Sequence, residues 1–376
     1  LNVRPSSRKS EGKRRSRYWA ATGLVSYGFS EKRLRADLRL SRQFESIHYT
    51  RAELAGGITT EQFDPNKQIG ELTNALYSIF DRRNYLKLYE KAYAQAKVGR
   101  TIAPGLRLEL QTEFAERRPL FNHSDYSLYK GDRQYTPNAP LPVPATEPER
   151  PLSQPHKAFL LEFAARIRPG ETYSTYPDFR VYQRSKWPTI ILRYTKALPG
   201  VAGSVVDYDL AQLRLNQNDL GFGLFGYSEW NLGAGIFLRK ERVEFMDYYH
   251  PKGNQTFLGR PNTYASSFFL LPYYEFSTAD RYVYAHWRHH FNGWILDKIP
   301  GLRKLNWKEA VGFGLYQSGD YAWENQRPET GLPYWEASIG FYNIGIKFFR
   351  PLHIDLAFGF LGREHYRTGL VLGINL

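Results

Sequence analysis

Apolar and charged residues alternate along several long segments of this chain, and this period-two pattern is the feature that most limits its fold. In the segment 34–40 (LRADLRL), leucine or alanine occupies every second position and Arg, Asp and Arg fill the positions between them. Segments 106–114, 159–168 and 352–360 repeat the pattern. Successive side chains of a strand point to opposite faces, so each segment predicts a strand with one apolar and one polar face. We therefore expect an all-β fold.

A soluble β-sandwich would also alternate, but two features favour a transmembrane antiparallel β-barrel. The segments run for about 10–12 residues, close to the length that crosses a bilayer at a tilt. Aromatic residues such as Trp19, Trp187, Trp294 and Trp335 lie near segment ends, where an interfacial girdle would form. The charged faces suit a water-filled lumen better than a packed core. The lumen-facing residues that we predict from this pattern are Arg107, Glu109, Glu113, Glu162 and Arg166.

The spacing of strands and loops predicts a barrel of about sixteen strands, because single-chain bacterial barrels close with an even number. Long connections at 60–87, 118–156, 239–280 and 318–333 all leave the same rim, which we take as external because such barrels have short periplasmic turns. We interpret 1–376 as a single barrel domain, with one more strand and a periplasmic domain expected upstream. The expected strands lie near 1–4, 18–29, 33–42, 46–59, 88–101, 106–117, 157–168, 189–197, 204–215, 221–238, 281–291, 307–317, 334–344, 350–361 and 366–376.

Two of the long loops carry features of their own. Residues 68–80 (QIGELTNALYSIF) place apolar residues at helical spacing, which predicts a short amphipathic helix within loop 60–87. Loop 239–280 contains an apolar FFLLPYY stretch, which is too apolar to remain in water. We expect this loop to fold back against the barrel or into its mouth.

Chemistry-bearing motifs are scarce. The chain has no cysteine, which excludes disulfides, Cys-ligated metals and cysteine nucleophiles. His286, His289 and His290 cluster in YAHWRHHF, but period two puts only His286 and His290 on one face, so three ligands cannot converge there. Nucleophile-elbow, P-loop, dinucleotide and calcium-loop motifs are all lacking. We expect no enzymatic activity, no cofactor and no metal.

The formal charge of +14 bears on partners. A basic surface suits anionic lipid head groups or lipopolysaccharide, although a basic lumen would account for the charge equally well. The basic run at 8–17 is interpreted as a solvated turn rather than a nucleic-acid patch, since no nucleic-acid module accompanies it. We expect lipid and other outer-membrane or periplasmic proteins as partners, and no nucleic acid.

Several blocks resemble an outer-membrane family of unknown function from Bacteroidota, whose longer members carry a carboxypeptidase-regulatory-like domain ahead of the barrel. The resemblance covers about residues 18–376, and its most specific block is 270–307. It implies an integral outer-membrane location and brings no assigned activity. The blocks are FDRRNYLKLYEKAY (80–93), ERRPLFNHSDYSLY (116–129), YTPNAPLP (135–142), TYPDFRVY (175–182), HPKGNQTF (250–257), LLPYYEFSTADRYVYAHWRHHFNGWILDKIPGLRKLNW (270–307) and GLVLGINL (369–376).

A more distant likeness concerns mechanism. The order of loop 239–280, an aromatic strand and IPGLRKLNWKEAVGFGLY (299–316) is similar to the second half of Omp85 (bacterial surface antigen) barrels. That resemblance implies a barrel that inserts or translocates outer-membrane proteins, with a long loop tucked into its lumen and held by an Arg-Gly-aromatic tripeptide. This chain has no Arg-Gly dipeptide and ends in Leu376 rather than an aromatic residue. The nearest candidate is Gly259-Arg260-Pro261, so the expected loop anchor is Arg260 with Gly259 and Gly253.

Three functions from different classes remain open at this stage. An Omp85-like assembly or translocation barrel predicts that loop 239–280 packs inside and that the seam between the first and last strands is weak. A passive or gated channel predicts an open lumen and measurable conductance. A structural or scaffold subunit of a larger outer-membrane complex predicts a plugged lumen and external loops that bind a partner.

Overall fold

The computed structural model is almost entirely β-structure, which confirms the predicted all-β class. It describes residues 18–44, 48–67, 69–128, 131–140, 154–176, 180–183, 185–259, 264–320, 331–346 and 349–374. One α-helix, α1 (Glu71–Asp81), accompanies the strands. Within the described ranges, no helix has the length and hydropathy that a transmembrane helix requires. The strands are β1 (Tyr18–Gly28), β2 (Arg33–Gln43), β3 (Arg51–Gln62), β4 (Leu88–Ala103), β5 (Leu106–Pro119), β6 (His156–Ile167), β7 (Tyr173–Thr175), β8 (Arg180–Tyr182), β9 (Thr189–Ala197), β10 (Asp207–Gly221), β11 (Tyr227–Arg242), β12 (Leu258–Gly259), β13 (Arg281–His290), β14 (Lys308–Ser318), β15 (Tyr334–Ile346), β16 (Phe349–Leu361) and β17 (Glu364–Ile374).

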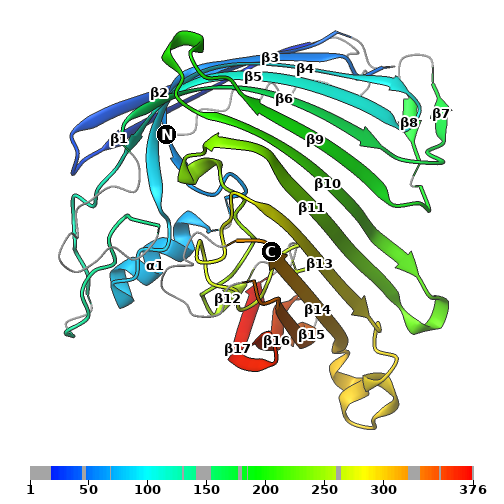
Figure 1. The fold of residues 1–376 in the computed structure, drawn as a ribbon. Helices are drawn as coiled ribbons and strands as arrows, with labels where there is room; N and C mark the ends of the chain where they lie inside the picture. Colours follow the sequence, from blue (N-terminus) through cyan, green and yellow to red (C-terminus); the bar gives the residue numbers. More distant parts are fainter. Residues whose placement is uncertain are drawn as a thin grey trace. The chain divides into compact units, whose positions relative to one another are not determined.

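The long strands follow one another as neighbours in a 15-stranded sheet, whose order is β1-β2-β3-β4-β5-β6-β9-β10-β11-β13-β14-β15-β16-β17-β12 (Figure 1). The short strands β7 and β8 form a separate hairpin between β6 and β9. The two-residue β12 comes from the long loop after β11 and pairs in parallel with β17. Every predicted strand from 18–29 onward is present, and the one near 1–4 lies outside the described residues.

Some strand boundaries differ from the prediction. The turn expected before position 221 lies at 222–226, so β10 extends to Gly221 and β11 starts at Tyr227. The reason is the backbone that the tight turn requires, since Gly223 and Gly226 have φ values of 62° and 96°. A Cβ on Gly226 would lie 1.8 Å from the carbonyl oxygen of His290, so only glycine fits there.

The chain divides into two compact units, which are described separately. Unit 1 comprises Leu1–Ala211 and Phe237–Asp247, and unit 2 comprises Gln212–Ile236 and Tyr248–Leu376. Strands β10 and β11 contribute residues to both units.

In unit 1, the apolar side of the alternating strands is open and the charged side is paired. Leu54, Val98, Leu110 and Phe163 are 44–61% exposed, and strand register places Val98 opposite Leu110 and Leu110 opposite Phe163. The other face carries ion pairs between neighbouring strands. These are Lys91 with Glu113 (3.0 Å), Lys97 with Glu109 (2.9 Å) and Arg193 with Glu162 (3.3 Å), and Arg107 pairs with Glu109 within β5 (2.8 Å).

The register of β5 and β6 also bears on the predicted lumen residues. It places Arg107 opposite Arg166 and Gln111 opposite Glu162, so Arg107, Glu109, Glu113, Glu162 and Arg166 share one face of the sheet. That this face lines a lumen stays a prediction.

Helix α1 begins three residues later than the predicted range 68–80 and ends one residue after it. Its polar side is the docked side: Asn74 Oδ1 accepts hydrogen bonds from the backbone N–H groups of Tyr85 (2.7 Å) and Leu86 (2.8 Å). Its apolar stripe, formed by Leu72, Leu76 and Phe80, is exposed. The helix is therefore held by polar contacts rather than by burial of its apolar face.

Strands β13 to β17 of unit 2 also have an exposed apolar face and a second face that is largely buried. One face, which we call the open face, carries large apolar side chains that are 40–51% exposed. Phe313 lies opposite Trp287, and Leu356 lies opposite both Ile339 and Leu370. The other face, which we call the covered face, holds small, polar and aromatic residues that are mostly buried, including Tyr316, Glu336, Asp355 and Val371.

Candidate functional site

The covered face of unit 2 is packed beneath residues 248–259 and 264–280, the described part of the long loop that belongs to this unit. Phe268, Leu271 and Phe276 of the loop are buried against Tyr316 and Tyr334 of the strands. A second cluster joins the loop to β16 and β17, and its members are Tyr264, Phe269, Leu270, Ala357 and Val371. The expectation that this loop folds back on the strands is confirmed for these residues.

Glycines on the strands make room for the loop. A Cβ on Gly314 would lie 2.9 Å from the ring of Phe268, and a Cβ on Gly369 would lie 2.6 Å from Leu270 Cδ2. Both glycines belong to the covered face, where a larger side chain would displace the loop. Glycine at alternate strand positions is therefore the signal in the sequence that could have located this contact, since glycine in a strand often marks close backbone approach.

Glu336 on β15 holds the centre of the loop. Its carboxylate accepts hydrogen bonds from the backbone N–H of Phe269 (2.6 Å) and of Leu270 (3.1 Å), and from the hydroxyl of Tyr334 (2.8 Å). The side chain is buried, at 3% exposure. A buried carboxylate that binds two adjacent N–H groups fixes both the position and the direction of the loop backbone. Reasoning from the sequence did not single out Glu336.

An arginine does anchor the loop, but it comes from a strand. Arg288 of β13 forms a buried ion pair with Asp355 of β16 at 2.7 Å. Its guanidinium lies over the ring of Tyr264 (5.0 Å) and near that of Phe269 (5.7 Å), both from the loop. The predicted anchor Arg260 lies outside the described residues, so its role stays a prediction.

The two glycines predicted with Arg260 sit at close contacts. A Cβ on Gly253 would lie 2.1 Å from the carbonyl oxygen of Leu271. A Cβ on Gly259 would lie 2.5 Å from Val371 Cγ1 on β17. Any side chain at either position would therefore push the loop backbone away from its neighbour.

Through β12 the loop also covers part of the edge of the last strand. Leu258 pairs with Leu372 and Gly259 with Gly373, in parallel. The N–H of Leu372 donates to the carbonyl oxygen of Phe257 at 2.6 Å. Strand edges present unpaired backbone groups, so this contact satisfies backbone groups of β17 from within the same chain.

The histidines singled out in the sequence have separate surroundings. His286 is buried against the ring of Phe268, at 4.3 Å between centroids. His290 Nε2 lies 2.7 Å from Glu229 Oε1, and His289 Nδ1 lies 2.8 Å from the hydroxyl of Ser228. Across the part of the chain that the structure describes, no group of three or more His, Asp or Glu residues is placed to hold a metal ion.

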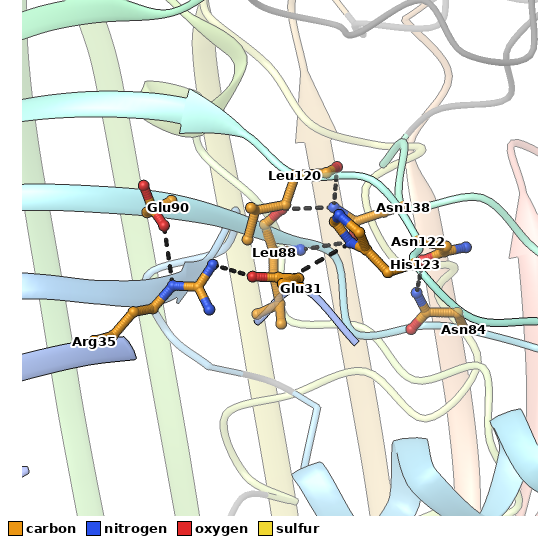
Figure 2. Close-up of polar contacts among 9 residues, drawn as sticks. All are labelled: Glu31, Arg35, Asn84, Leu88, Glu90, Leu120, Asn122, His123 and Asn138. Carbon is orange, nitrogen blue, oxygen red and sulfur yellow. Dashed lines mark hydrogen bonds and ion pairs between the residues drawn. The ribbon is translucent and has the colours of Figure 1, made fainter. Parts of the chain in front are cut away.

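A polar network ties together three connections in unit 1 (Figure 2). Arg35, only 6% exposed, donates to Glu90 Oε2 at 3.0 Å and pairs with Glu31, which lies 3.7 Å from His123.

Asn138 acts as a side-chain bridge: it accepts from the N–H of Leu88 (2.9 Å) and donates to the carbonyl oxygens of Leu88 and Leu120 (both 2.7 Å). Asn84 donates to Asn122 at 3.2 Å. These bonds fix the loop after β5 against the start of β4 and the β1–β2 turn.

Residues 1–340 match the family model described as "Family of unknown function (DUF5686) C-terminal domain". The chain belongs to this family. Among solved structures, this family member is similar to BamA from Haemophilus ducreyi lacking POTRA domains 1–3, at 11% identity and a TM-score of 0.44, with 94% of this chain and 69% of that chain covered. It is also similar to CdiB from Acinetobacter baumannii, at 10% identity and a TM-score of 0.42, with 95% and 56% covered. No curated protein matches it.

The buried Lys87 of this DUF5686-family chain should make the free energy of unfolding depend on pH. It lies between α1 and β4, it is 5% exposed, and its ammonium donates to the carbonyl oxygen of Pro137. Burial lowers the pKa of Lys87 to about 7. The unfolded chain, with its lysine pKa of 10.5, binds more protons than the folded chain above pH 7. The free energy of unfolding should therefore rise between pH 7 and pH 10, by at most about 1.4 kcal/mol per pH unit.

The measurement compares wild type with Lys87→Met by urea unfolding in detergent micelles at several pH values. The difference in stability between the two proteins should move in favour of wild type as the pH rises above 7, and should be constant below it. A difference that does not change with pH would show that Lys87 stays charged in the fold.

Proposed function

We propose that this DUF5686-family chain is the membrane-spanning barrel domain of an outer-membrane protein. The observation that carries the proposal is the inversion of the two strand faces: the large apolar side chains are on the open face, and the polar residues are paired or covered. A soluble sheet protein would bury the apolar face, because an extensive exposed apolar surface is unfavourable in water. A bilayer reverses that preference, and strands that present apolar residues outward and polar residues inward suit a transmembrane barrel.

Within that class, we propose an Omp85-like role in assembling or translocating outer-membrane or surface proteins, without enzymatic activity. The support is the way that residues 248–259 and 264–280 occupy the covered face of unit 2 and pair with the edge of β17. A loop that covers both a strand face and a strand edge can be displaced to offer them to another polypeptide, since strand addition needs only main-chain hydrogen bonds along an edge.

The same contacts bear on the alternatives. A passive channel needs an unobstructed water path, and the packing of Phe268, Leu271 and Phe276 on the strands works against one in unit 2. A structural subunit of a larger outer-membrane complex is compatible with this packing and with the exposed apolar stripe of α1. It therefore stands as the second candidate.

The test of the barrel is gel mobility of the detergent-folded chain, unheated against boiled. A closed barrel resists unfolding in cold dodecyl sulfate, so the unheated sample should migrate differently from the boiled one. The same mobility in both lanes, together with solubility in the absence of detergent, would contradict the membrane proposal.

The test of the Omp85-like role uses liposomes that contain the folded chain and a urea-denatured outer-membrane barrel as client. The client should fold faster than in empty liposomes. Unchanged client folding, combined with a large steady conductance across planar bilayers, would favour the channel. Unchanged folding without conductance would favour the structural subunit.

A further inference from the structure

One rim of unit 2 gathers exposed apolar side chains that the proposed assembly role does not use. It is the rim at which β10 turns into β11, β13 connects to β14 and β15 turns into β16. We call the residues there the aromatic rim. Leu224 and Ile346 are the most exposed of them, at 89% and 80%. The members are Phe222, Leu224, Phe225, Trp294, Ile295, Ile299, Leu305, Ile346 and Phe349.

The aromatic rim continues the open face of the strands. On β13, Trp287 of the open face stacks with His289 (6.1 Å, 18°), and His289 contacts Phe291 at 4.5 Å. Phe291 then stacks with Trp294 (6.4 Å, 21°), and Trp294 meets Phe225 of the neighbouring turn at 5.2 Å. Contacts between rings therefore continue from the open face of β13 onto the β13–β14 connection.

The β13–β14 connection has a defined structure. It contains two short 3₁₀ helices, Leu296–Lys298 and Leu302–Leu305. The N–H of Ile295 donates to Glu309 Oε1 at 2.7 Å, and Arg350 donates to the carbonyl oxygen of Leu305 at 2.5 Å. These bonds from β14 and β16 hold the apolar side chains in place at the rim.

Basic side chains accompany the apolar ones. Residues 291–308 contain Lys298, Arg303, Lys304 and Lys308 against a single acid, Asp297, so the segment has a net charge of +3. The ammonium of Lys298 lies 3.9 Å from the centre of the Trp294 ring. Aromatic and aliphatic residues beside Lys and Arg are the composition of elements that lie in a membrane interface and attract anionic lipids.

We propose that the β13–β14 connection is a membrane-surface anchor that binds the head groups of anionic phospholipids. Trp294, Ile295 and Ile299 enter the boundary between head groups and acyl chains, while Arg303 and Lys304 contact lipid phosphates. This inference rests on the membrane location proposed above, and it adds a preferred lipid class and the surface that selects it. Within unit 2, the rim lies opposite the connections from β11 to β13 and from β14 to β15, so it faces the periplasmic leaflet if those connections are external.

The test uses the full chain in lipid nanodiscs with a fluorescent reporter. Because the chain has no cysteine, Leu305→Cys gives a single labelling site at the rim. Quenching of the attached dye is compared between brominated phosphatidylglycerol and brominated phosphatidylcholine, each diluted in unbrominated phosphatidylcholine. The anionic lipid should quench several-fold more strongly at low salt, and the preference should fade near 1 M salt because exposed charges are then screened.

The decisive variant is Arg303→Gln with Lys304→Gln in the labelled protein. Its matched control is Arg363→Gln with Arg367→Gln, which removes two exposed charges from the opposite rim of the same unit. The first pair should reduce the preference by about fivefold per charge, and the control should leave it unchanged. Equal quenching by the two lipids in the parent protein, or an equal loss in both variants, would overturn the inference.

The two proposals fail in different ways. If the labelled protein shows no heat-dependent gel shift, then the membrane barrel itself is wrong. If the shift is present and the lipid preference is absent, then only the lipid anchor is wrong.

Discussion

Glu336→Gln should release residues 248–280 from the covered face of unit 2. The carboxylate accepts from two adjacent backbone N–H groups, and an amide can accept from only one of them while its own N–H₂ opposes the other. A buried donor without a partner costs about 1–3 kcal/mol. The loop should therefore open at least ten times more often, which corresponds to about 1.4 kcal/mol.

Trypsin provides the measurement, because Lys252 lies within the loop and is half-buried in the closed state. Cleavage after Lys252 should be at least tenfold faster in Glu336→Gln than in wild type. The matched control is Glu364→Gln, an exposed glutamate at the start of β17, which should cleave at the wild-type rate. Wild-type cleavage in Glu336→Gln would mean that packing of Phe268 and Leu271 holds the loop without the carboxylate.

Ile339→Arg should prevent or strongly destabilise folding in lipid bilayers. Ile339 is 50% exposed near the middle of β15, with Val311 and Leu356 as its neighbours across the sheet. An arginine on the lipid face near the bilayer midplane costs about 2–4 kcal/mol. In water the same substitution at an exposed site would change stability by no more than about 0.5 kcal/mol.

The folded fraction in bilayers, read from the heat-dependent gel shift at increasing urea, is the quantity to compare. Ile346→Arg is the control, because Ile346 is 80% exposed at the end of the same strand, where arginine costs about 0–1 kcal/mol. If Ile339→Arg unfolds at the wild-type urea concentration, then the open face contacts water, and the membrane proposal is wrong.

The strand segments were predictable because a strand's alternation is a local property. Each residue of LRADLRL is placed on one face or the other by the backbone geometry of its own segment, so the period can be recognised without knowing any neighbour. The helix in loop 60–87 was found for the same reason. The orientation of the helix could not be predicted in this way. Asn74 faces the rest of unit 1 because it accepts hydrogen bonds from Tyr85 and Leu86, which lie beyond the helix, and this leaves Leu72 and Phe80 exposed.

The candidate site was predicted only in outline. The apolar FFLLPYY stretch required a partner, which is why loop 239–280 was expected to fold back. Glu336, Arg288 and Asp355 carried no local signal, since each is one charged residue among many in an alternating strand. Their roles arise from pairs separated by 67 residues, as in the bonds of Glu336 to Phe269 and of Arg288 to Asp355.

Residue type and the two-residue repeat of a strand are enough to predict that this chain is built of strands with one apolar and one polar face. Which face is open and which is covered by the long loop follows from contacts between distant parts of the chain. Those outcomes depend on which strands become neighbours and on where glycines leave space between them. Such contacts join distant residues, and no local pattern specifies them.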